Sequence, residues 1–184
     1  MSATAQPLMT VETFLAWAQG QPEGARYELA AGQLVAMAPE RAAHVRSKQR
    51  LCQRLESAID GAGLPCEAFV DGLGVRVDDT TLYIPDVLVR CGPPIADDTT
   101  TILDPLIVVE ILSPSTQGVD SGTKFVDYFR IATLRHYLIV RVETKTVIHH
   151  ARNDDGTILT RIVRDGGAIA LDPPGLLLDG LFAA

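Results

Sequence analysis

The spacing of apolar residues predicts a helix and then a hairpin at the start of the chain. Residues 10–18 carry apolar side chains at helical intervals, with Thr10 placed to cap the first turn. A proline and a glycine within 21–24 end this helix. Two short runs rich in apolar residues, 26–29 and 33–37, flank a loop that contains Gly32. They predict a β-hairpin with a short turn.

The longest predicted helix covers residues 41–60. Its apolar side chains recur at helical spacing and form one stripe, which consists of Val45, Cys52, Leu55 and Ile59. Arginine recurs every four residues on nearly the opposite side, at Arg46, Arg50 and Arg54. The helix is expected to end at Gly61 and Gly63.

The remainder of the chain is dominated by predicted strands, at 66–70, 73–77, 82–90, 106–112, 136–140, 147–151 and 158–163. The last two form a hairpin, and a short closing segment follows from Pro173. One more helix is expected over 124–131, with Ser121 as its cap. The order predicts a mixed α/β fold, in which helices flank a central mixed sheet between an N-terminal helix and hairpin and a C-terminal hairpin.

Composition describes one ordinary globular domain. A length of 184 residues suits a single domain over 1–184, of which we expect 1–9 to be flexible. Apolar residues make up 47% and charged residues 21%, which excludes a disordered chain. No apolar run approaches the roughly 20 residues that span a bilayer, so no membrane partner is expected. The net charge of −7 argues against a protein that coats nucleic acid but leaves room for a small basic patch.

The three cysteines give a prediction about location. Cys52, Cys66 and Cys91 lack the paired spacing of a metal site and are expected to be small buried thiols in a reducing compartment. Residues 1–7 show no basic segment followed by an apolar one, as an export signal would. We therefore expect a cytoplasmic protein.

Two of the predicted strands each carry one acidic residue among apolar neighbours. Asp86 lies in 82–90 and Glu110 in 106–112, and Lys124 follows on the next helix. A carboxylate in an apolar strand is costly unless a metal ion or another cation offsets its lost hydration. If the two strands are neighbours in register, both carboxylates meet on one face, where Mg²⁺ or Mn²⁺ suits their hard oxygens. The alternative is that Asp86 only opens a turn beside a proline and that Glu110 pairs with an arginine.

These residues resemble a known motif. Pro85-Asp86 followed by Glu110-Ile111-Leu112 is similar to the PD-(D/E)XK nuclease superfamily, whose fold is restriction-endonuclease-like. The superfamily's lysine would stand where this chain has Leu112. The chain most resembles the Uma-two family, a branch of restriction-endonuclease-like domains of unknown function. The segments that carry this resemblance are 10–14, 26–29 with Gly32, 84–87, 108–116, and Asp120 with Lys124 and Tyr128.

The resemblance implies roles for individual residues. Asp86 and Glu110 would ligate the metal, with the backbone carbonyl of Ile111 as a third ligand. Lys124 would replace the missing lysine and assist the attacking water. Glu28 matches a recurrent Tyr-Glu-Leu position and is a candidate further ligand; otherwise it is an exposed strand glutamate.

Other residues have weaker claims. His44 matches a recurrent family position and is expected behind the metal ligands as a hydrogen-bond donor, unless it serves only packing. Tyr128 lies four residues after Lys124 and would brace it or touch a phosphate, unless it is simply half-buried. The arginine row at 46, 50 and 54 would track a nucleic-acid backbone, unless it is a solvated helix face. The adjacent His149 and His150 point to opposite sides of a strand and make a poor metal pair.

The sequence therefore predicts a Mg²⁺- or Mn²⁺-dependent DNA endonuclease that hydrolyses phosphodiester bonds. By the habit of similar nucleases, it would act as a homodimer. A second hypothesis is a catalytically silent member of the same fold that binds nucleic acid or a protein partner. A third is a metal-dependent hydrolase of some other phosphoester.

Overall fold

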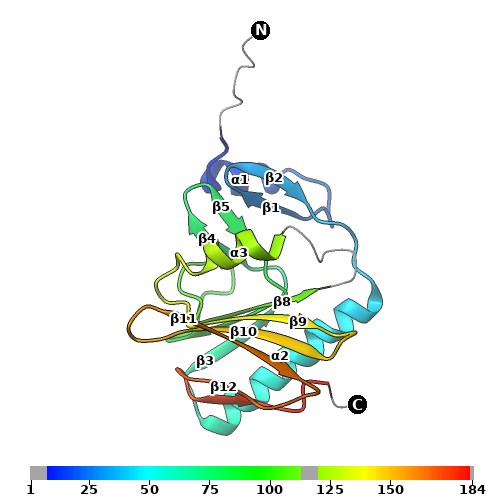
Figure 1. The fold of residues 1–184 in the computed structure, drawn as a ribbon. Coiled ribbons are helices and arrows are strands. Elements are labelled where there is room, and N and C mark those ends of the chain that lie inside the picture. The colour runs from blue at the N-terminus through cyan, green and yellow to red at the C-terminus, as the bar shows by residue number, and fades with distance from the viewer. Residues whose placement is uncertain (1–7, 113–119, 183–184) are drawn as a thin grey trace.

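The computed structural model describes residues 8–112 and 120–182 (Figure 1). Its helices are α1 (Val11–Ala18), α2 (Ala42–Ala62) and α3 (Asp120–Tyr128). None of the helices in this part of the chain combines the length and apolar character that a bilayer crossing demands. We expected residues 1–9 to be flexible, and residues 1–7 of this segment lie outside the described range. Met9 is held in place, because its N–H donates to the Gly32 carbonyl at 3.1 Å.

The strands form three sheets. The largest has the order β11-β10-β9-β8-β6-β3. Its strands, in chain order, are β3 (Cys66–Val70), β6 (Val87–Cys91), β8 (Ile107–Leu112), β9 (His136–Arg141), β10 (Thr146–Arg152) and β11 (Ile158–Arg164). A second sheet has the order β2-β1-β5-β4-β7 and contains β1 (Tyr27–Ala30), β2 (Gln33–Ala36), β4 (Gly74–Asp78), β5 (Thr81–Tyr83) and β7 (Thr101–Ile102). The third is the small pair β12 (Ile169–Leu171) and β13 (Leu176–Leu178).

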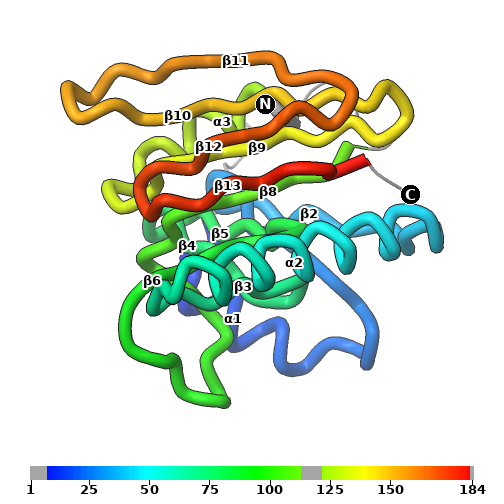
Figure 2. The backbone as a smooth tube through the Cα atoms, turned by 90° about the horizontal axis from the view of Figure 1, so that it is seen from below, coloured from blue at the N-terminus to red at the C-terminus, as the bar shows by residue number. Residues whose placement is uncertain are grey.

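The six-stranded sheet is the middle layer of the molecule. In Figure 1, α3 and the five-stranded sheet lie on one side of it, and α2 and β12 lie on the other. Figure 2, seen from below, shows α2 and the β12–β13 pair lying across the same face. Two apolar cores fill the gaps, one between this face and α2 and one between the opposite face and α3. The predicted mixed α/β fold with helices flanking a central sheet is confirmed.

Local signals placed several elements correctly. The Thr10 hydroxyl accepts from the Thr13 N–H at 3.3 Å and caps α1. The turn between β1 and β2 consists of Ala31 and Gly32, both with positive φ, as a two-residue hairpin requires. Gly63 caps the end of α2 with a φ of 63°, whereas Gly61 lies inside the helix.

The predicted strand at 82–90 is wrong, because the chain changes sheets in its middle. β5 ends at Tyr83 in the five-stranded sheet, and β6 begins at Val87 in the six-stranded one. Pro85 stands at the crossing, where its missing N–H costs no ladder hydrogen bond. Asp86 therefore lies just outside the strand rather than within it.

Three smaller predictions also need correction. Ser121 is the second residue of α3 rather than its cap, because the helix begins at Asp120. The closing segment supplies β13, which pairs with β12 in a hairpin. Val45 is 47% exposed and does not join the apolar stripe of α2. The buried face of this helix is turned slightly from the predicted one and includes Lys48.

Two of the three cysteines are not free thiols. Cys66 and Cys91 stand directly opposite each other in the β3–β6 ladder and form a disulfide, whereas Cys52 is free and buried. The prediction of three buried thiols is wrong for this pair. Their separation of 25 residues gave no hint of the pairing, which depends on the register of two antiparallel strands.

A buried histidine pair ties the C-terminal hairpin to the central sheet. The Pro173 carbonyl can only accept, so His136 donates to it from Nε2 at 2.9 Å. His136 Nδ1 therefore accepts from His149 Nε2, also at 2.9 Å. Both rings are neutral in this arrangement, and burial lowers the pKa of His136 and lowers that of His149 to about 4. His150 faces the other way, against Phe125.

We predict that this pair destabilises the fold in acid. Because the pKa of His149 is about 4 in the folded chain and ~6.5 when unfolded, its contribution to stability falls as pH drops through that window. His149→Gln keeps a donor but cannot titrate. Urea unfolding at pH 7.5 and 5.0 should show the native chain losing about 2 kcal/mol relative to this variant. Titrating groups that do not contact His149 contribute equally to the stability of both chains and cancel in the comparison. A difference in the free energy of unfolding that stays constant with pH would contradict the assignment.

Candidate metal centre

Asp86 is held by the point at which the chain crosses between sheets. Its Oδ2 accepts from the Ile111 N–H of β8 at 2.6 Å. This N–H lies just beyond the last residue pair of the β6–β8 ladder. The backbone there is fixed too, because the Asp86 carbonyl accepts from the Asp71 N–H at 3.0 Å. The turn beside Pro85 thus exists, as the alternative interpretation of Asp86 had it, but it also aims the carboxylate at the next strand.

Glu110 projects from the middle strand of the large sheet. β8 pairs with β6 antiparallel through Val87↔Val109, and with β9 parallel through Glu110↔Ile139. Alternation along β8 puts Glu110 on the face that packs against α3. There its Oε1 accepts from Lys124 Nζ at 3.2 Å and from the Tyr128 hydroxyl at 3.0 Å. Its cationic partner is thus a lysine, not the arginine of the alternative interpretation.

Glu28 joins this group from the five-stranded sheet. It is 5% exposed, so the alternative of an exposed strand glutamate is wrong. Its Oε1 accepts from the Ile84 N–H at 2.8 Å and from Lys124 Nζ at 3.0 Å. Lys124, itself 6% exposed, therefore lies between the carboxylates of Glu28 and Glu110.

A second buried lysine holds Asp86 from the side of α2. Lys48 is 2% exposed, and its Nζ lies 3.4 Å from Asp86 Oδ1. The same ammonium contacts Glu40 Oε1 at 2.6 Å and Asp71 Oδ2 at 2.9 Å. Arg26 pairs with both of these outer carboxylates. His44, one turn before Lys48, places Nε2 3.2 Å from Asp86 Oδ1.

Sequence reasoning missed Lys48 and two carboxylates that contact it, Glu40 and Asp71. It also missed Arg26, which pairs with these carboxylates. A signal for Lys48 was present, because it lies four residues after His44 and four before Cys52, on the buried face of α2. Treating Val45 as a member of the apolar stripe hid it. The other three lie on connecting segments or in turns, where no periodicity marks a residue as functional.

The electrostatics of the two carboxylates differ sharply. Burial raises the pKa of Glu110 to about 7; the positive charge of Lys124 opposes this rise, and the negative charges of Asp86 and Glu28 add to it. Burial also acts to raise the pKa of Asp86, but hydrogen bonds from His44 and the Ile111 amide, with the charges of His44 and Lys48, bring it below its ordinary value. The hydrogen bond to Asp86 in turn raises the pKa of His44.

Both carboxylates line one open cavity of about 500 Å³. Ion pairs beside it join five carboxylates to three cations: Glu28, Glu40, Asp71, Asp86 and Glu110 to Arg26, Lys48 and Lys124. Counted over the part of the chain that the structure describes, this largely buried cluster holds two more carboxylates than Lys and Arg cations.

Carboxylate oxygens, such as those of Asp86 and Glu110 on this cavity, are the ligands that Mg²⁺ and Mn²⁺ prefer. A second set lies beside them, because Glu40, His44 and Asp86 each offer one ligand atom and these three atoms lie within 4.8 Å of one another. Asp86 belongs to both sets.

The remaining predicted residues lie around this centre. Ile111 lines the cavity, and its N–H is used by Asp86. Tyr128 is 0% exposed and donates to Glu110, which is neither the lysine brace nor the phosphate contact expected of it. Arg46 and Arg50 are exposed on α2, and Arg54 donates to the Asp179 carbonyl at 3.3 Å.

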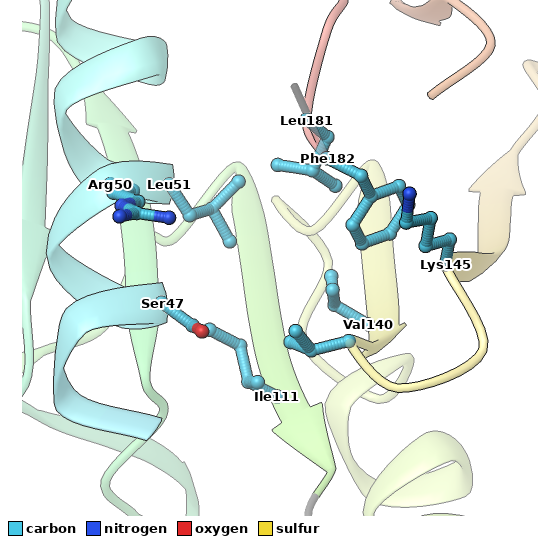
Figure 3. A pocket seen from close by; sticks show the side chains of 9 residues that line it. Ser47, Arg50, Leu51, Ile111, Val140, Lys145, Leu181 and Phe182 are labelled. Carbon is cyan, nitrogen blue, oxygen red and sulfur yellow. The ribbon is translucent and has the colours of Figure 1, made fainter. Parts of the chain in front are cut away.

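A smaller pocket adjoins the cavity. It measures about 150 Å³ and shares Ser47, Ile111 and Val142 with the larger one. Figure 3 shows Leu51 and Ile111 on one side of it and Val140 and Phe182 on the other. Arg50 and Lys145 add two positive charges to its lining.

Comparison with known sequences assigns the chain to a family. The profile of the Uma2 family, described as "Putative restriction endonuclease", matches residues 11–179. This chain belongs to the Uma2 family. The uncharacterized protein slr1290 of Synechocystis sp. is 34% identical over 151 residues, which cover 82% of this chain and 77% of that protein. A second Synechocystis protein, the uncharacterized sll1609, is 27% identical over 146 residues, covering 77% and 81%.

A solved structure supports the fold of this Uma2 protein. A crystal structure from Anabaena variabilis, titled as a putative nuclease belonging to DUF820, superposes with a TM-score of 0.71 at 15% identity. The match covers 95% of this chain and 98% of that one. The expected resemblance to the Uma-two family and to a nuclease fold is confirmed.

We predict that Lys124 is essential to the stability of this cluster. Lys124→Met removes the ammonium that pairs with the buried carboxylates of Glu28 and Glu110. It should lower the free energy of unfolding by about 3 kcal/mol. Adding Glu28→Gln removes one of the stranded charges and should restore at least about 1 kcal/mol. Urea unfolding at pH 7.5 without divalent ions measures both changes.

A matched control for this prediction is Lys145→Met, which removes an exposed lysine and should change stability by less than about 0.5 kcal/mol. If Lys124→Met behaves like that control, or if the second substitution adds to the loss, Lys124 does not compensate the two carboxylates.

Proposed function

We propose that this Uma2 protein is a metal-dependent endonuclease that hydrolyses phosphodiester bonds in DNA. The observation that carries the proposal is the joint placement of Asp86 and Glu110 on one cavity, within a cluster that holds more carboxylates than cations among the described residues. Mg²⁺ or Mn²⁺ bound there would polarise a phosphoryl oxygen and lower the pKa of a water molecule. The family description supports the nuclease class.

In this proposal the chain's own residues divide the work between two helices. From α3, Lys124 presents a fixed ammonium beside Glu110, where it can orient the attacking water and stabilise negative charge on the phosphorus centre. The Tyr128 hydroxyl holds the Glu110 carboxylate in place. From α2, His44 would donate to Asp86 and orient it from behind the ligands, a role that its contact with Asp86 Oδ1 supports.

The surroundings of the cavity suit a DNA strand. The overall charge is −7, so a phosphate backbone must approach over a local basic surface. Arg46 and Arg50 are exposed on α2, and Arg50 with Lys145 lines the adjoining pocket (Figure 3). Arg54 is partly used by a backbone carbonyl and is the weakest of the three predicted arginines. Cleavage of both strands would need two such centres, so we propose a homodimer. The Cys66–Cys91 disulfide argues against the reducing compartment on which the prediction of a cytoplasmic protein rested.

One observation favours a catalytically silent protein of the same fold instead. Both Asp86 oxygens already have partners, since Oδ2 accepts from Ile111 and Oδ1 contacts His44 and Lys48. A carboxylate satisfied by protein groups can persist without a metal ion. Metal binding and DNA cleavage must therefore be measured separately.

We expect the purified chain to nick supercoiled plasmid DNA when Mg²⁺ or Mn²⁺ is present. Asp86→Asn and Glu110→Gln keep side-chain volume but remove ligand charge, and each should slow nicking by about 100-fold or more. Glu143→Gln is the matched control, because Glu143 is an exposed carboxylate on the same cavity that takes no part in the cluster. Nicking rates are read from agarose gels, with folding checked by circular dichroism.

Equal nicking by all three variants would reveal a contaminating nuclease and contradict the proposal. A native chain that shows no Mn²⁺ binding by calorimetry and does not cut would support the silent alternative.

A further inference from the structure

We propose that Lys48 is a positioning residue whose ammonium fills the place of a second cation, so that the centre binds one divalent ion rather than two. This inference rests on the proposed metal centre at Asp86 and Glu110. It concerns the number of ions bound and the residue that sets it.

The first step is the position of the ammonium. Lys48 is 2% exposed, and Nζ lies 2.6 Å from Glu40, 2.9 Å from Asp71 and 3.4 Å from Asp86. The ammonium donates hydrogen bonds to Glu40 and Asp71 and forms an ion pair with Asp86. A long side chain gives up considerable rotamer freedom to be held in this way, which the three contacts must offset.

The second step is that two of these carboxylates belong to a ligand set. Glu40, His44 and Asp86 present three ligand atoms within 4.8 Å of one another, and two oxygens with one imidazole nitrogen suit Mn²⁺ or a similar divalent ion. Lys48 contacts two members of that set, Glu40 and Asp86. An ion held by the three residues would compete with the ammonium for the same two carboxylates.

The third step is charge. On the α2 side, Glu40, Asp71 and Asp86 face Lys48 and Arg26, which leaves one negative charge. On the α3 side, the described residues set two carboxylates, Glu28 and Glu110, against the one ammonium of Lys124. One divalent ion held by Asp86 and Glu110 would offset the excess on both sides. Without Lys48 a further negative charge would stand beside an intact set of three ligands, and a second ion would be attracted there.

The test counts ions directly on the full chain. Calorimetric titration with MnCl₂, with free Mn²⁺ followed by electron paramagnetic resonance, should give one ion per native chain and two per Lys48→Met chain. Lys145→Met removes an exposed lysine and should leave the number at one. Lys48→Met with Glu40→Gln breaks the ligand set and should return the number to one.

A further variant keeps the test decisive if Lys48→Met fails to fold. Lys48→Gln removes the positive charge, keeps a hydrogen-bond donor for the carboxylates around it and leaves Glu40, His44 and Asp86 intact, so it too should bind two ions. Circular dichroism confirms folding before each titration.

The outcomes separate this inference from the proposed function. One ion in the native chain and one in both folded Lys48 variants overturns the role of Lys48 while the metal centre stands. Two ions in the native chain also overturn it, because Lys48 then excludes nothing. No ion in the native chain overturns the metal centre and, with it, this inference.

Discussion

A cluster of five carboxylates and three cations, counted over the residues that the structure describes, borders one cavity of this protein. Removing such charges from water costs far more than a small domain can spare unless they are paired. Lys48 and Lys124, both nearly inaccessible to solvent, provide most of the compensation, and each bridges carboxylates from separate segments. Asp86 and Glu110 belong to this cluster, and the chemistry proposed for the site rests on its excess of carboxylates.

The same cluster joins the layers of the fold. Glu28 binds the Ile84 amide and Lys124, and so connects the five-stranded sheet to the crossing segment and to α3. Asp86 binds the Ile111 amide and His44, and so connects that crossing to β8 and α2. A change of sheet between Tyr83 and Val87 thus positions two of the acidic side chains. Structural and functional demands coincide at this segment, where loss of one partner would disturb several layers.

The sequence predicted much of this arrangement, for identifiable reasons. Apolar periodicity located the helices and most strands, and unexpected acids in apolar runs marked Asp86 and Glu110. What it could not supply is register and crossing between sheets. The break at Pro85, the Cys66–Cys91 pairing and the opposition of Glu40 and Asp71 around Lys48 all depend on segments distant in sequence. Lys48 itself was within reach, since a lysine on the buried face of a helix demands a partner.

The central claim is that Asp86 and Glu110 share one divalent cation. A crystal of the native chain soaked in MnCl₂ tests it directly through the anomalous signal of manganese. The account predicts a peak at roughly 2.0–2.3 Å from one oxygen of each carboxylate, with the Lys48 ammonium still bound to Glu40. A peak bound by neither carboxylate, or the absence of any peak while Lys124 and Lys48 keep all their contacts, would contradict it.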